Sequence, residues 1–234
     1  MRIRLIRKED QPKGTWAGGT TTQLAIGPEG ADYASRRFEW RISSARVDLD
    51  ASDFTPLPGF RRILMILEGN VHLTHEGVRE IHLAPFEQDV FEGAWRTRSR
   101  GRCVDFNLMT AEGWTGSVTA LLPIGRDTAL RPGREVRVDT PLSGDVEAFY
   151  CLCDETDVLI DSEFWLEEMN RGDFLLIESP EPGAALAVSG RGKKPLGVHV
   201  RISRGARRGV KIVLPSRNSR KRLLNDHWLK AGGR

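Results

Sequence analysis

Polar side chains recur at alternate positions in the most apolar segments of this chain. They are Arg41 and Ser43, Arg62, and Asp105 and Asn107. Successive residues of a β-strand point to opposite faces, so Arg41 shares a face with Ser43, and Asp105 shares a face with Asn107. A guanidinium can pair with a carboxylate through two parallel hydrogen bonds. A few such donors set in an apolar cup predict a pocket for a small organic acid.

Three further candidates extend this predicted pocket. Thr20 follows the flexible pair Gly18-Gly19 and supplies a hydroxyl, and Phe91 supplies an apolar wall, as does Trp16. A glycine pair also occurs in ordinary turns, and large aromatic side chains also occur in cores. Both interpretations of these three side chains therefore stay open.

The polar residues themselves have structural alternatives. Arg62 and Asp105 can form an ion pair that braces the fold, and Asn107 can satisfy backbone groups at a strand end. Alternation alone also leaves open which face of each strand points inward. The ligand-binding set predicted from the sequence is Thr20, Arg41, Ser43, Arg62, Phe91, Asp105 and Asn107.

The histidines argue against a metal centre. Two imidazoles on one strand bind one ion when they occupy alternate positions, but His72 and His75 are three residues apart and His82 lies beyond a turn. No histidine occurs between His82 and His199. We therefore predict no metal and no cofactor, and histidines that face solvent.

No catalytic set emerges from the spacing. The chain has no Gly-x-Ser-x-Gly nucleophile elbow, no phosphate-binding Gly-x-x-x-x-Gly-Lys-Ser/Thr loop and no dinucleotide fingerprint. Asp105 facing a pocket could serve as a general base. A metal-independent isomerase or hydrolase therefore remains the alternative to a binding protein.

Short apolar segments separated by 24 glycines and 12 prolines predict the architecture. Expected strands include residues 38–43, 62–67, 71–74, 81–84, 104–109, 148–153 and 174–177. This spacing is typical of an all-β sandwich or barrel. The two halves echo each other weakly, which predicts two antiparallel β-barrels at 1–125 and 126–200, followed by a C-terminal segment at 201–234.

The formal charge of +3 hides a division of the chain. Residues 1–200 carry 24 Lys and Arg against 31 Asp and Glu, a net charge of −7, whereas residues 201–234 carry 11 against one, a net charge of +10. Ser219 and Gly232 can bound a short helix in this segment. A basic segment can bind nucleic acid, dock on a partner or stay solvated. Nucleic-acid binding and a homodimer are kept as alternatives.

Composition also bounds the cellular setting. No apolar run approaches the roughly 18–20 residues that cross a bilayer, and no secretory signal is evident. The three cysteines, Cys103, Cys151 and Cys153, are too few for a disulfide scaffold and suit buried thiols in a reducing compartment. We expect a cytoplasmic protein.

Ordered fragments of the chain resemble the HutD/Ves family of bacterial bicupins. Trp16–Leu24 resembles its Trp-x-x-Gly-x-Thr segment, and Trp40–Ala45 resembles its Arg-Ile-Ser-x-Ala strand. Phe54–Arg62 matches its Phe-Ser-x-Phe-Pro-Gly-x-x-Arg segment, and Phe91–Gly93 and Asp105–Met109 complete the pattern. The resemblance covers roughly residues 10–110 and implies two cupin-like barrels.

The resemblance also implies a function. Its name links the family to histidine utilization, where urocanate or a formylated or formimino glutamate would be the ligand of a sensor or metabolite buffer. The chain departs from the family pattern at Arg61, at Ala94 and at Thr110–Gly113, where charged residues are exchanged. These departures alter the charge near the expected pocket and with it the expected choice of ligand.

Overall fold

The computed structural model describes residues 1–122, 135–160, 165–191 and 195–205. Apart from the short 3-10 helix η1 (Lys8–Asp10), the regular structure of these residues is entirely β-strand. Residues Met1–Arg204 form one compact unit. None of the described helices is long and apolar enough to span a membrane. The all-β class predicted from the short apolar segments is confirmed.

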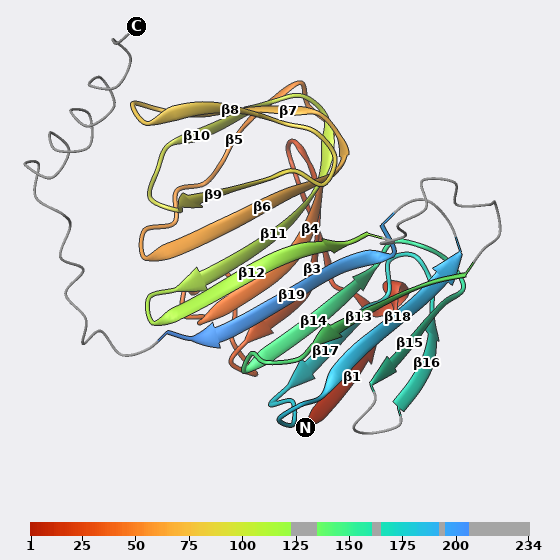
Figure 1. Cartoon of the computed structure of the whole chain (residues 1–234). Helices are drawn as coiled ribbons and strands as arrows, with labels where there is room; N and C mark the ends of the chain where they lie inside the picture. Colours follow the sequence, from red (N-terminus) through yellow and green to blue (C-terminus); the bar gives the residue numbers. More distant parts are fainter. Residues whose placement is uncertain (123–134, 161–164, 192–194, 206–234) are drawn as a thin grey trace, which may run out of the picture. The chain divides into compact units, whose positions relative to one another are not determined.

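Two antiparallel sheets contain most of the first half of the chain (Figure 1). The six-stranded sheet has the order β2 (Lys13–Trp16), β3 (Gly19–Gly27), β4 (Trp40–Val47), β11 (Cys103–Ala111), β6 (Phe60–Gly69) and β9 (Gln88–Glu92). The four-stranded sheet has the order β5 (Ala51–Asp53), β10 (Thr97–Arg100), β7 (Val71–His75) and β8 (Arg79–Leu83). Leu64 and Ile66 of β6 pack against Val71 and Leu73 of β7, which joins the two sheets through one apolar core.

Two further sheets contain most of the second half. The five-stranded sheet has the order β1 (Arg2–Ile6), β17 (Phe174–Glu178), β14 (Val146–Cys151), β19 (Gly197–Arg204) and β12 (Trp114–Leu121). The other four-stranded sheet has the order β13 (Glu135–Pro141), β18 (Ala185–Arg191), β15 (Thr156–Ile160) and β16 (Trp165–Met169). Phe149 and Leu175 pack against Val158 and Leu186 between these two sheets.

A third core joins the two pairs of sheets. Ile42, Phe106 and Leu108 of the six-stranded sheet share one buried cluster with Leu176 and Val200 of the five-stranded sheet. The four sheets therefore form four layers, with the six- and five-stranded sheets in the middle. Both middle sheets are covered by another sheet on both faces, which explains the long apolar runs of strands such as β6 and β17.

Strand pairing crosses the two halves of the sequence. β1 pairs with β17, and β12 pairs with β19, although β1 and β12 both lie within the range 1–125. Ile3 and Leu5 of β1 pack against the core between the five-stranded sheet and its partner, which ties the start of the chain to the second half. The division into one barrel at 1–125 and a second at 126–200 stays a prediction. The five-stranded sheet contains strands from both ranges.

The C-terminal segment begins later than its predicted start at residue 201. β19 continues through Arg204, because Val200 and Ile202 alternate into the buried core between the middle sheets. The short helix predicted between Ser219 and Gly232 lies outside the described residues.

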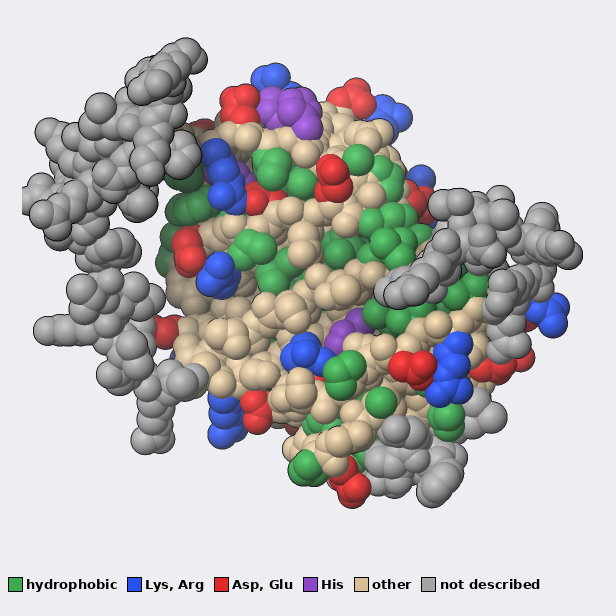
Figure 2. Space-filling view, viewed as in Figure 1, with side chains coloured by type: hydrophobic (Ala, Val, Ile, Leu, Met, Phe, Trp, Pro, Cys, Tyr) green, Lys and Arg blue, Asp and Glu red, His purple; other side chains and the backbone are tan. Residues whose placement is uncertain are grey.

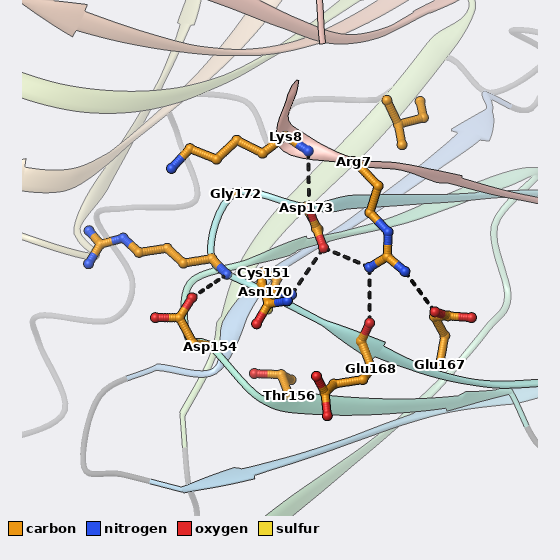
Figure 3. Close-up of polar contacts among 12 residues, drawn as sticks. Arg7, Lys8, Cys151, Asp154, Thr156, Glu167, Glu168, Asn170, Gly172 and Asp173 are labelled. Carbon is orange, nitrogen blue, oxygen red and sulfur yellow. Dashed lines mark hydrogen bonds and ion pairs between the residues drawn. The ribbon is translucent and has the colours of Figure 1, made fainter. Parts of the chain in front are cut away.

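A buried aspartate fastens the N-terminal strand to the second half (Figure 3). The carboxylate of Asp173 accepts hydrogen bonds from the backbone N–H groups of Lys8 and Asn170, both at 3.0 Å, and from Nη1 of Arg7 at 2.9 Å. Arg7 also donates to Glu167 at 2.7 Å. Gly172 precedes Asp173 with φ +99°, a left-handed backbone that favours glycine.

Charges of both signs are mixed on the surface of the folded part. On the face shown in Figure 2, Lys and Arg side chains of the described residues alternate with Asp and Glu side chains, and hydrophobic side chains gather between them. The acidic excess of residues 1–200 is therefore not concentrated on that face.

Candidate functional site

A cavity of about 540 Å³ opens on the inner face of the six-stranded sheet. Polar side chains from three neighbouring strands line it, namely Arg41 and Ser43 of β4, Arg62 of β6, and Asp105 and Asn107 of β11. The neighbours of these residues in sequence, such as Ile42, Ile63 and Phe106, point to the opposite face and fill the core between the middle sheets. Burial of those apolar residues therefore decides that the polar residues face the cavity.

The ligand-binding residues predicted from the sequence line this cavity, except for Thr20 and Phe91. Thr20 pairs with Arg46 and faces away from the cavity, whereas Thr21 pairs with Ala45 and lines it. Phe91 is 2% exposed, packs in the core between the first two sheets and does not line the cavity. The alternative interpretation of Phe91 as a core residue therefore fits the structure.

Other lining residues were not predicted from the sequence, and three of them carry polar or aromatic side chains that contribute to the site. Gln23 lies on β3 two positions after Thr21, and Tyr33 and Phe54 lie in connecting segments. The alternation of β3 would have identified Gln23 once its register with β4 was known. No local pattern marks Tyr33 or Phe54, because their positions depend on how loops cross the sheet.

Hydrogen bonds hold the Arg41 guanidinium in place. Nε donates to Oε1 of Gln23 at 3.1 Å, and Nη1 donates to Oγ of Ser43 at 3.0 Å. The guanidinium also lies over the Tyr33 ring, 4.3 Å from its centroid. Burial lowers the pKa of Arg41, although a guanidinium remains charged at neutral pH.

Aromatic rings, not hydrogen bonds, surround the second arginine. The guanidinium carbon of Arg62 lies 4.8 Å from the ring centroid of Phe54 and 5.2 Å from that of Phe91. Nε is buried and has no hydrogen-bond partner among the described residues. Burial lowers the pKa of Arg62 to about 10, and the nearby charge of Asp105 offsets part of this effect.

Asp105 is a buried carboxylic acid beside this arginine. It is 5% exposed, and its Oδ1 has no hydrogen-bond partner among the described residues. Burial raises the pKa of Asp105 to about 7, against the opposing influence of Arg62 and of the Ala45 backbone N–H. No direct ion pair joins Asp105 to Arg62 within 4.0 Å, so the bracing pair considered from the sequence is not formed.

Asn107 completes the cavity floor. It is 5% exposed, and its Oδ1 is also buried without a hydrogen-bond partner among the described residues. The two unpaired acceptors, on Asp105 and Asn107, and the unpaired donor, Nε of Arg62, therefore belong to side chains that line the same cavity as the Arg41 guanidinium. Because unpaired buried polar atoms are unfavourable, this arrangement suits a polar ligand with an acidic group for the guanidinium groups and hydrogen-bond donors for the two acceptors.

His82 is exposed, as expected from the sequence, whereas His75 differs from that expectation. His75 is 1% exposed, and its ring nitrogens lie 2.7 Å from Oδ2 of Asp89 and 2.8 Å from Oγ1 of Thr97. Arg79 pairs with the other oxygen of Asp89. This buried network satisfies the polar groups of β7 within the first two sheets, so His75 serves packing there.

His199 is buried as well, in the five-stranded sheet. Its Nε2 lies 2.7 Å from Oε2 of Glu147, whose other oxygen accepts a hydrogen bond from Nε of Arg201 at 2.9 Å. Within the described residues, no group of three or more His, Cys, Asp or Glu side chains is arranged to hold a metal ion.

None of the three cysteines forms a disulfide within the described residues. Cys103 and Cys151 are buried, and burial raises the pKa of their thiols to about 12 and about 11. Both thiols are therefore protonated at neutral pH, which removes the nucleophilic form.

Solved structures with the same arrangement of sheets share little sequence with this chain. A conserved protein of unknown function from Pseudomonas aeruginosa PAO1 has a TM-score of 0.70 and 21% identity over 87% of this chain and 100% of that chain. HutD from Pseudomonas fluorescens SBW25 has a TM-score of 0.65 and 20% identity over 88% and 100%. The pirin YhhW from Escherichia coli, in complex with nickel(II), has a TM-score of 0.53 and 11% identity over 88% and 100%. No curated protein matches the chain.

The layered sheets and the cavity on the inner face of one sheet define a cupin-like β protein. The sequence model of the HutD family matches residues 8–195, four-fifths of the chain. The chain belongs to the HutD family, as its ordered fragments predicted.

Proposed function

We propose that this chain binds a small metabolite with a carboxylate group in the cavity of the six-stranded sheet. The observation that carries the proposal is the unpaired Nε of Arg62, which is buried beside the unpaired oxygens of Asp105 and Asn107. A charged guanidinium removed from water is strongly unfavourable unless a counter-charge and hydrogen bonds compensate it. A bound carboxylate would supply both.

The balance of charge in the cavity favours an anion. Arg41 and Arg62 are both less than 10% exposed, and the one buried carboxyl among the lining residues, Asp105, is about half protonated at neutral pH. Arg41 already donates from Nε and Nη1 to protein oxygens. Arg62 is held only by ring faces, so it is the better anchor for a ligand carboxylate.

The chemical class of the ligand follows from family membership and from the lining. Urocanate and formylated or formimino glutamate are the candidates that the family name suggests, and each combines a carboxylate with a nitrogen group. The rings of Tyr33 and Phe54 and the side chain of Met109 offer apolar contacts for the remainder of such a molecule. We propose the role of a cytoplasmic sensor or metabolite buffer in histidine utilization.

Thermal shift with the full chain tests this proposal. Urocanate and N-formylglutamate are expected to raise the melting temperature of the wild-type protein, and Arg62→Ala is expected to abolish the shift. Arg62→Lys keeps the charge but not the planar pair of donors, so it should retain a reduced shift. Arg100→Ala, on the exposed part of β10, is the matched control and should respond like wild type. An undiminished shift in Arg62→Ala would contradict the assignment.

An enzyme is the second candidate. A general base works best when its pKa lies near the working pH, and burial places the pKa of Asp105 at about 7. A metal-independent isomerase or hydrolase would show turnover of one of these metabolites, and Asp105→Asn would remove turnover while binding persists.

A further inference from the structure

We propose that Asp105 takes up a proton when a carboxylate binds, and that its protonated carboxyl group then donates a hydrogen bond to the bound anion. This inference rests on the proposed binding function and assigns a specificity-determining residue within that site. It goes beyond attraction to arginine, because it makes one of the protein's own acids a hydrogen-bond donor for the ligand.

The position of the Asp105 side chain is the first argument. Its carboxyl group lies on β11 and lines the same cavity as Arg62 and Asn107. The group is 5% exposed, and Oδ1 has no partner among the described residues. An acid that served only to balance Arg62 would form a direct ion pair with it, and no such pair lies within 4.0 Å. No described protein group therefore competes with a ligand for Oδ1.

The second argument comes from the charged groups that face Asp105. Arg41 of β4 and Arg62 of β6 are the buried cations. The thiol of Cys103, on β11 itself, stays protonated because burial raises its pKa to about 12. The phenol of Tyr33 also lines the cavity, and Lys13 of β2 and Asp53 of β5 lie exposed at its rim. No second buried carboxylate competes with Asp105 among these lining residues.

Binding places a second carboxyl group in the same cavity. Two carboxylates that share a buried site repel each other, and one of them keeps a proton. The ligand carboxylate gains the two-donor contact with Arg62, so the proton goes to Asp105. The two carboxyl groups then no longer repel each other, because the Asp105 O–H donates a short charge-assisted hydrogen bond to the ligand O⁻.

Protonating Asp105 costs little free energy near neutral pH. Burial already raises the pKa of Asp105 to about 7 in the unliganded protein. A nearby ligand charge raises it further, so affinity should be constant below that pH. Above it, affinity should fall by about tenfold for each pH unit, because each binding event must first supply one proton.

Isothermal titration calorimetry of the full chain with N-formylglutamate tests the inference. Its carboxyl groups are ionised above about pH 5.5, so the probe brings no proton of its own. Titrations in buffers of different ionisation enthalpy give the number of protons taken up. We expect nearly none at pH 6, about one half at pH 7 and nearly one at pH 8.5. Asp105→Asn should bind without proton uptake and with an affinity independent of pH.

A matched control separates this effect from general electrostatics. Asp53→Asn makes the same chemical change at the exposed rim of the same cavity, and it should take up protons like wild type. Binding without proton uptake at pH 8.5, or uptake that persists in Asp105→Asn, would overturn the inference and leave the binding function standing. Failure of the wild-type protein to bind any carboxylate probe at pH 6 would instead remove the binding function and this inference with it.

An infrared measurement gives a readout without ligand. The unliganded wild-type protein at pH 6 should show the absorption of a protonated carboxyl group that Asp105→Asn lacks. A difference spectrum without that band would show that Asp105 is ionised in the empty cavity at pH 6, which contradicts the expectation that binding at this pH takes up nearly no proton.

Discussion

Replacing Asp105 by asparagine should make the folded protein more stable at neutral and alkaline pH. In the unfolded chain this carboxyl group ionises near its ordinary pKa of 3.8, whereas burial holds its folded pKa at about 7. Between these two values the folded state keeps a proton that the unfolded state has lost. The stability of the wild-type protein therefore falls as pH rises through this interval. Asparagine has the same shape and no charge, so it removes this loss.

The magnitude follows from the two pKa values. One pH unit corresponds to about 1.4 kcal/mol, so the full loss is about 4 kcal/mol, of which roughly 3 kcal/mol falls between pH 5 and pH 8. The difference in unfolding free energy between Asp105→Asn and wild type should grow by that amount over this range. Other groups titrate equally in both proteins and cancel in the difference.

Urea unfolding followed by tryptophan fluorescence at pH 5, 6, 7 and 8 measures this difference directly. The matched comparison is Asp53→Asn, whose carboxylate is exposed at the rim of the cavity, and its difference from wild type should stay nearly constant. Parallel stability curves for Asp105→Asn and wild type would refute the reasoning, because they would mean that the Asp105 carboxyl group ionises as it does in water.

Two other changes probe the frame around the site. Asp173→Ala removes the acceptor for Arg7, Lys8 and Asn170, and urea unfolding at pH 7 should show a loss of about 2–3 kcal/mol, whereas an unchanged midpoint would contradict the role of this clamp. Truncation after Arg204 should leave circular dichroism and the ligand-induced thermal shift unchanged, because residues Met1–Arg204 form one compact unit; loss of the shift would mean that the basic segment contributes to binding.

Local sequence pattern was enough to group the polar residues but not to orient them. Alternation placed Asp105 with Asn107 and Arg41 with Ser43, and all four line the cavity. The inward direction was undetermined because both faces of these strands are buried. Only the core between the two middle sheets, formed with residues about 70 to 160 positions away, shows that the apolar neighbours such as Phe106 occupy the other face.

The predicted site residues and the residues that line the cavity differ where the register between strands determines which side chain faces inward. Thr20 and Thr21 are adjacent and chemically identical, and a shift of one residue moves a side chain to the opposite face. The pairing of Thr21 with Ala45 determines that Thr21, and not Thr20, faces the cavity. That pairing joins strands separated by a long connection. His75 shows the same limit, since its burial depends on Asp89 and Thr97 of other strands.

Long-range strand pairing also lies beyond local pattern. The residues of β1 read as a short amphipathic strand, but nothing near them indicates β17 as the partner, which lies more than 160 residues later. The clamp formed by Arg7 and Asp173 bridges the same separation. Such contacts are fixed by the closure of the layers, not by the propensity of either segment.

A comparison of the two middle sheets explains why we place the ligand in the six-stranded sheet and not in the five-stranded sheet. Each carries polar residues at alternate positions of a late strand, Asp105 and Asn107 in β11 and His199 and Arg201 in β19. In β19 both side chains meet Glu147, which also accepts hydrogen bonds at 2.7 Å from the backbone N–H groups of Ser143 and Gly144.

The charges of His199, Arg201 and Glu147 nearly compensate one another within the protein. Glu147 brings the negative charge that Arg201 and its neighbours need, and the hydrogen bonds from backbone N–H groups help to keep its pKa low despite burial. The corresponding acid beside Arg62 makes no ion pair with it within 4.0 Å, whereas Glu147 lies 2.7 Å from His199 and 2.9 Å from Arg201. The buried charges of the five-stranded sheet are therefore compensated by direct ion pairs, whereas that of Arg62 in the six-stranded sheet is not. An added anion would stabilise only the six-stranded sheet, which is the sheet that holds the cavity.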